Sequence, residues 1–85
     1  MRFLPLTALT LACSTALAAG PLNFEDAARL ALARLPDGRV HSVERETHLG
    51  REVFEVEVHT PDGCEHELVL SATDGEMIRQ KRDCD

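Results

Sequence analysis

Hydrophobic and polar residues change their spacing once along the chain, near Gly38. Before this point, residues 23–38 read NFEDAARLALARLPDG, and apolar side chains recur every three or four positions, as on one face of an α-helix. Asn23 is a suitable N-cap with Asp26 three residues later, and Pro36 ends the pattern. The segment predicts a helix whose alanines pack closely against a sheet.

After Gly38 apolar residues alternate with polar ones, which predicts strands over 39–47, 51–60, 64–71 and 76–84, joined by glycine-containing turns. The first strand is less regular, because Val40 and Val43 differ in parity. A β-bulge or a later strand start would explain this. The predicted fold class is α+β, with one N-terminal helix packed on a four-stranded antiparallel meander sheet.

Two Asp-Gly turns fix the expected strand register. If residues 60–64 and 72–76 both form type I turns with a glycine bulge, Leu70 lies opposite Phe54 on one side and opposite Ile78 on the other. Two independently assigned turns then place the same set of side chains on the face that the helix covers. This predicted core face contains Phe54, Val56, Val58, Leu68, Leu70, Ile78, Cys64 and Cys84.

The same register places Cys64 opposite Cys84. Opposed residues on antiparallel strands lie within reach of a disulfide, and closing a loop of about 20 residues contributes about 3 kcal/mol. The alternatives are a zinc site, which needs about four ligands, and a redox pair, which usually has Cys-x-x-Cys spacing. A structural disulfide is the favoured interpretation.

Residues 1–18 match a secretory signal peptide. Arg2 provides a positive start, an apolar run follows, and Ala16-Leu17-Ala18 fits a signal peptidase site. Cleavage there leaves residues 19–85 as one small domain, periplasmic or secreted. Processing as a lipoprotein, with a lipid anchor at Cys13, is the alternative.

Composition narrows the range of partners and activities. The chain has 15 acidic and 9 basic residues and a net charge of −6. Nucleic acids and anionic membrane surfaces both require a basic surface, so neither is expected to bind the processed domain. Because the sequence shows no phosphate-binding loop and no catalytic triad around its serines, we expect neither an enzyme nor a cofactor.

The solvent-facing side of the predicted sheet is the candidate binding surface. It would place Glu57 opposite Glu67, whose repulsion Lys81 would relieve, and Arg79 could reach toward Glu55. A solvated face with charge pairs would show the same pattern. The functional interpretation is a surface for a basic or peptidic partner, with Glu55, Glu57, Glu67, Arg79 and Lys81 as its residues.

The histidines give little indication of a metal site. None shows the i, i+4 helical spacing or the His-x-His strand spacing of ligands. We therefore expect surface or sheet-edge histidines and assign no metal site. The four residues are His41, His48, His59 and His66.

The order of short motifs resembles that of the PepSY domain. Leu35-Pro36-Asp37-Gly38-Arg39-Val40 follows the helix, Phe54-Glu55-Val56-Glu57-Val58 lies mid-sheet, and Thr73-Asp74-Gly75-Glu76-Met77-Ile78 comes near the end. The resemblance implies a cystatin-like α+β fold without catalytic residues. It also implies a role like that of the PepSY domains in the propeptides of thermolysin-like metallopeptidases, which inhibit or assist a peptidase.

Three hypotheses follow. The first is an exported PepSY-like module that binds and regulates a protein partner such as a peptidase. The second is an envelope protein that binds a metal ion or small ligand through its acidic face and histidines. The third is a redox protein, which would require a readily reduced Cys64–Cys84 bond.

Overall fold

A computed structural model describes residues 21–85, and the predicted signal peptide and Cys13 lie outside this range. Helix α1 spans Phe24–Arg34. It begins at a capping box, in which the Asn23 side chain accepts from the backbone N–H of Asp26 at 2.8 Å and the Asp26 carboxylate accepts from that of Asn23 at 3.0 Å. These bonds satisfy donors that a helix start otherwise leaves free, so the predicted start is confirmed.

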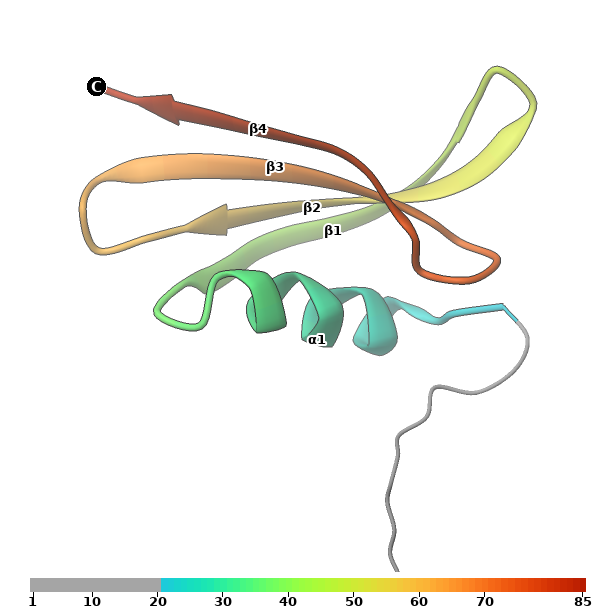
Figure 1. Cartoon of the computed structure of the whole chain (residues 1–85), viewed down its shortest axis with the longest axis horizontal. Helices are drawn as coiled ribbons and strands as arrows, with labels where there is room; N and C mark the ends of the chain where they lie inside the picture. The colour runs from blue at the N-terminus through green and yellow to red at the C-terminus, as the bar shows by residue number, and fades with distance from the viewer. Residues whose placement is uncertain (1–20) are drawn as a thin grey trace, which may run out of the picture.

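Four antiparallel strands follow in a meander: β1 (Arg39–His48), β2 (Arg51–His59), β3 (Cys64–Ser71) and β4 (Met77–Cys84). Helix α1 lies along one face of this sheet, beside β1 and β2 (Figure 1). The predicted α+β class, with one helix on a four-stranded antiparallel sheet, is therefore confirmed.

The core lies between α1 and the sheet. Ala27 and Ala31 are fully buried on the helix, and their small side chains let its backbone approach the strands closely. The Phe24 ring, which is half exposed, covers the edge of this core and makes an edge-to-face contact with Phe54 at 5.2 Å between centroids. The remaining buried cluster comprises Leu22, Phe54, Val56, Val58, Leu68, Leu70 and Ala72.

The irregularity of the first strand is a β-bulge. Val40 pairs with Val58 and Ser42 with Glu57, so His41 is an extra residue without a partner on β2. The bulge restores the alternation and lets both Val40 and Val43 pack against the core.

Strand pairing follows the predicted register over most of the sheet. Phe54 lies opposite Leu70, and the N–H of Gly63, at a φ of 88°, donates to the carbonyl of Thr60 at 3.0 Å in the β2–β3 turn. Cys64 lies opposite Cys84 with their Cα atoms 4.2 Å apart, and the structure joins them in a disulfide.

The β3–β4 turn corrects one part of that register. Leu70 lies opposite Met77, not Ile78, and a bulge places Ile78 on the surface, where it is 40% exposed. The cause is Ala72, which was expected to pair with Glu76. Its N–H donates to Glu52 of β2 at 3.0 Å and its carbonyl accepts from Leu22 at 2.8 Å, so its backbone is unavailable to β4.

We expect loss of the disulfide to destabilise the domain. Replacing Cys64 and Cys84 together by alanine should lower the free energy of unfolding by about 3 kcal/mol, because the unfolded chain regains the freedom of the loop. Urea denaturation of the variant and of the reduced wild type should give the same loss. An unchanged unfolding midpoint would contradict a structural role.

Gly75 and Gly50 provide a matched pair of substitutions, since both have a φ of 79°. A Cβ at Gly50 would meet open space, but one at Gly75 would lie 2.8 Å from Cδ1 of Leu30. Gly50→Ala should therefore cost only the left-handed strain, about 1 kcal/mol, and Gly75→Ala should cost more. Equal losses in thermal unfolding would show that contact between the β3–β4 turn and α1 is unimportant.

Candidate functional site

The sheet face turned away from α1, called here the outer face, brings together all five predicted binding residues. Across β2, β3 and β4, Glu57 lies opposite Glu67 and Glu67 opposite Lys81. In the neighbouring row, Val69 separates Glu55 from Arg79. The other outer-face positions are Arg39, His41, Ser42, Glu44, Glu46 and His48 on β1, Arg51, Val53 and His59 on β2, Glu65 and Ser71 on β3, and Asp83 on β4.

The cations of β4 neutralise this face only weakly. Arg79 does not reach toward Glu55 as expected, and its Nη2 atom lies 3.9 Å from Oε1 of Glu67. Within residues 21–85, Lys81 forms no ion pair shorter than 4.0 Å. The repulsion between Glu57 and Glu67 is therefore only partly offset.

Glu55 lies at the centre of the negative charge. Burial, followed by the charges of Glu46 and Glu67, raises the pKa of its carboxyl group above the ordinary value. Glu44 lies directly opposite on β1, and His48 Nε2 approaches a Glu55 oxygen at 3.0 Å. A carboxylate in these surroundings would be better stabilised by a cation than by solvent.

Two groups of side chains on the outer face lie close enough together to share a metal ion: His41 with Glu57 and His59, and Glu46 with His48 and Glu55. Sequence spacing missed both, because their members come from different strands. For the first group, the parity break between Val40 and Val43 was the available signal, since it indicates the bulge that carries His41.

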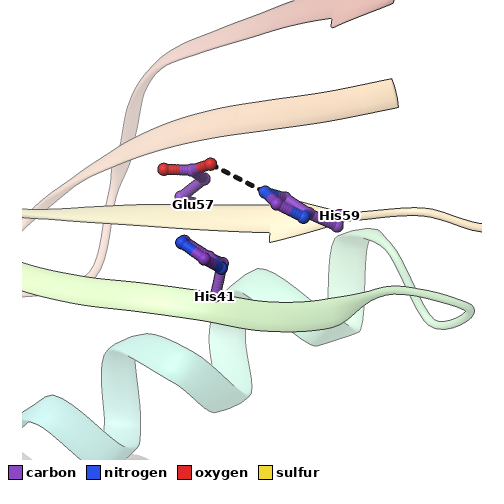
Figure 2. Close-up of side chains that lie close together, drawn as sticks. All are labelled: His41, Glu57 and His59. Carbon is purple, nitrogen blue, oxygen red and sulfur yellow. Dashed lines mark hydrogen bonds and ion pairs between the residues drawn. The ribbon is translucent and has the colours of Figure 1, made fainter. Parts of the chain in front are cut away.

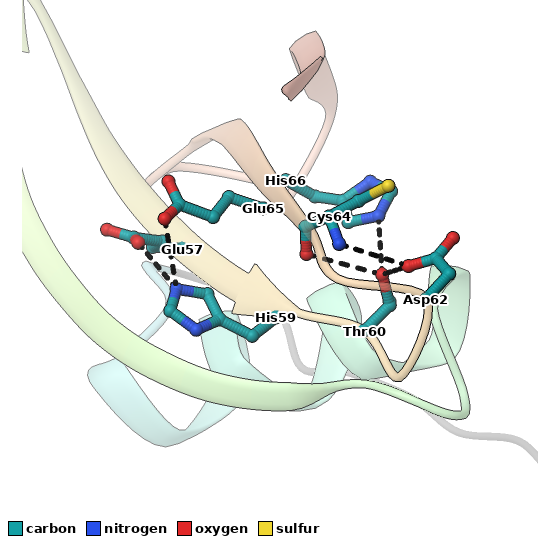
Figure 3. A network of polar contacts seen from close by, with 7 residues as sticks. All are labelled: Glu57, His59, Thr60, Asp62, Cys64, Glu65 and His66. Atoms are coloured by element: carbon teal, nitrogen blue, oxygen red, sulfur yellow. Dashed lines mark hydrogen bonds and ion pairs between the residues drawn. The ribbon is translucent and has the colours of Figure 1, made fainter. Parts of the chain in front are cut away.

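His66 lies on the opposite face, and the expectation of a surface histidine is wrong for it. It is only 7% exposed, and Nε2 lies 3.0 Å from the Thr60 hydroxyl (Figure 3). That hydroxyl donates to Asp62, so it accepts from His66, and Nδ1 is buried with no hydrogen-bond partner among residues 21–85. The hydrogen bond from Thr60, then that from the Cys64 N–H, lowers the pKa of Asp62, which indicates a structural role in the turn.

An open cleft of about 470 Å³ lies between the end of α1 and the β2–β3 turn. Arg34 and Arg82 line it together with Asp37 and Asp62. Because two basic and two acidic residues line it, the cleft favours neither anions nor cations, unlike the outer face.

The protein is thus a small α+β domain with one helix on an open antiparallel sheet and an acidic outer face. The family model described as peptidase propeptide and YPEB domain matches residues 21–81. The chain therefore belongs to the PepSY family, as its motifs predicted. Searches of the curated proteins and of the solved structures gave no significant match.

The family defines a peptidase-propeptide-like module, and PepSY domains are typically non-catalytic. Among residues 21–85 no helix is long and apolar enough to cross a membrane. That the chain is not an enzyme stays a prediction.

Glu55 and Glu52 should affect stability in opposite directions as the pH changes. The raised pKa of Glu55 means that the folded protein binds this proton more tightly, so stability falls as the pH rises from about 4.3, the unfolded value, through the folded pKa. Glu55→Gln removes the ionisable group and therefore this loss of stability. Its melting temperature should exceed that of the wild type near neutral pH, and the gain should vanish below about pH 4.

Glu52 provides the contrast, since hydrogen bonds from the Thr47 hydroxyl and then from Arg45 lower its pKa. Its contribution to stability is present above the unfolded pKa and is lost as the pH falls through the folded one. Glu52→Gln should therefore lower the melting temperature near neutral pH. If both variants shift it in the same direction, the opposite pKa shifts assigned to Glu55 and Glu52 are wrong.

Proposed function

We infer that the protein is an exported, periplasmic or secreted, PepSY module that binds a protein partner through its outer face and regulates that partner. Membership of a family found in peptidase propeptides supports this, and it makes a peptidase the favoured partner. The signal-peptide pattern in residues 1–18 supports export.

The observation that carries the proposal is the incompletely neutralised negative charge of the outer face. Helix α1 covers only the other face, so β2 and β3 present their carboxylates to solvent. Glu57 and Glu67 oppose each other, and Glu55 has a raised pKa. A partner that supplies Lys or Arg side chains would relieve both effects on binding.

The outer face also has an apolar base. Val53 and Val69 point to this side of the sheet, yet they are only 1% and 2% exposed. Charged side chains on neighbouring strands cover these two valines, so that the carboxylates lie at the surface and apolar groups lie beneath them. Such a surface suits a basic segment that lies across the strands, with Lys81 and Arg79 of β4 as the positive edge that sets its direction.

Charge reversal on two strands tests this proposal. Each exported peptidase encoded in the same genome should be purified and assayed with and without the protein, and one should bind or be inhibited. Glu67→Lys should weaken that interaction, and Lys81→Glu should strengthen it. Both effects should shrink as salt rises, because exposed charges are screened.

Asp37→Lys is the control, since Asp37 is exposed beyond the end of α1 and lies off the outer face. It changes the net charge as much as Glu67→Lys and should leave binding unchanged. Equal weakening by the two Lys variants would indicate a general charge effect and remove the outer face from the proposal. If no exported peptidase responds, the peptidase assignment fails.

A further inference from the structure

We propose that His41, Glu57 and His59 form a binding site for a divalent transition-metal ion, Zn²⁺ or Cu²⁺, on the outer face of the sheet. Figure 2 shows the three side chains, one from β1 and two from β2, gathered on the same side of these strands. The site shares Glu57 with the partner-binding surface, but the variants that test it, at His41, His48 and His59, differ from those that test the partner-binding proposal.

The β1 bulge is what assembles the group. Glu57 and His59 are two residues apart on β2, so alternation places both on the outer face. His41, the extra residue between the Val40–Val58 and Ser42–Glu57 pairs, therefore lies between these two side chains. A regular strand would offer one β1 side chain at each paired position and none between them.

The distances fit a shared ion. Ligand atoms of the three residues all lie within 4.8 Å of one another. The two imidazole rings stack with centroids 4.6 Å apart and an 8° angle between their planes, and His59 Nε2 lies 2.7 Å from a Glu57 oxygen. Glu65 lies opposite His59, with an oxygen 4.0 Å from Nε2, and could provide a fourth ligand (Figure 3).

Small rotations of side chains would complete the coordination. Bonds of about 2.0–2.2 Å to nitrogen and oxygen draw tetrahedral ligands closer than the present spacing. His41 is exposed, and the side chains of Glu57 and His59 are each 35% exposed, so all three can turn without disturbing the core. Water can occupy any position that the protein leaves open.

Ligand chemistry selects the ion. Two imidazoles and a carboxylate suit Zn²⁺ and Cu²⁺, whereas Ca²⁺ and Mg²⁺ prefer shells of oxygen ligands. The neighbouring group, Glu46 with His48 and Glu55, contains a single imidazole, so it is the weaker site for these ions. Cys64 and Cys84 are bonded to each other and provide no thiolate ligand.

Metal binding has a defined consequence for His59. Without the ion, Nε2–H donates to the Glu57 carboxylate. Since a metal ligand needs a free lone pair, the ion would bind at Nε2 and the ring proton would move to Nδ1. The hydrogen bond to Glu57 would be replaced by two bonds to the same ion.

The test uses the purified protein without a histidine tag and with its disulfide intact. Calorimetric titration with Zn²⁺, and separately with Cu²⁺, should show one ion per chain. His41→Ala and His59→Ala should each weaken binding by about tenfold or more, since removing a ligand should cost at least as much as the loss of a second-shell contact. NMR of the imidazole nitrogens should show His59 changing to its Nδ1–H tautomer, while buried His66 stays unchanged.

His48→Ala is the matched control, because it removes a histidine from the other group on the same face. Its affinity should equal that of the wild type. The site is wrongly assigned if His48→Ala weakens binding and His41→Ala does not. The proposal is overturned if neither ion binds or if the His41 and His59 variants bind as the wild type does. Because none of these variants changes Glu67 or Lys81, failure here leaves the partner-binding proposal unaffected.

Discussion

Packing of α1 on one face of the sheet is the interaction on which the rest of the structure depends. Ala27 and Ala31 are fully buried against strands whose inward side chains include Phe54 and Val56. Because side chains alternate along a strand, burying one face fixes which residues reach solvent on the other. The acidic outer face is therefore a direct consequence of the same packing that forms the core.

The helix does not stabilise all four strands equally. It packs on β1 and β2, and along β4 every residue after Met77 is exposed. Burial of apolar surface therefore contributes little to keeping β4 in place, and the strand relies on its hydrogen bonds to β3 and on the disulfide near its end. A disulfide is expected at this position, because so small a domain buries too little apolar surface to stabilise every strand.

The bulge in β1 links the core to the outer face. Its extra residue, His41, lets Val40 and Val43 both pack inward. His41 itself lies beside His59 on the other side of the sheet. One local irregularity thus serves packing and assembles a group of potential metal ligands. Bulges often reposition side chains near functional sites in this way.

Features whose causes are local could be predicted from the order of residues. Capping residues, helical and alternating periodicity, and glycine turns were enough to predict α1, the four strands, most of the register and the Cys64–Cys84 pair. The motif order predicted the family. These features depend on neighbouring residues and on pairing rules that a linear pattern records.

The remaining features depend on contacts between elements that are distant in the sequence. The backbone of Ala72 bonds to Glu52 and Leu22, and this turned Ile78 outward. Burial of His66 and the meeting of His41 with His59 likewise depend on contacts between strands. Spacing along a chain cannot show such contacts, because the partners are chosen when the strands pair and the helix covers them.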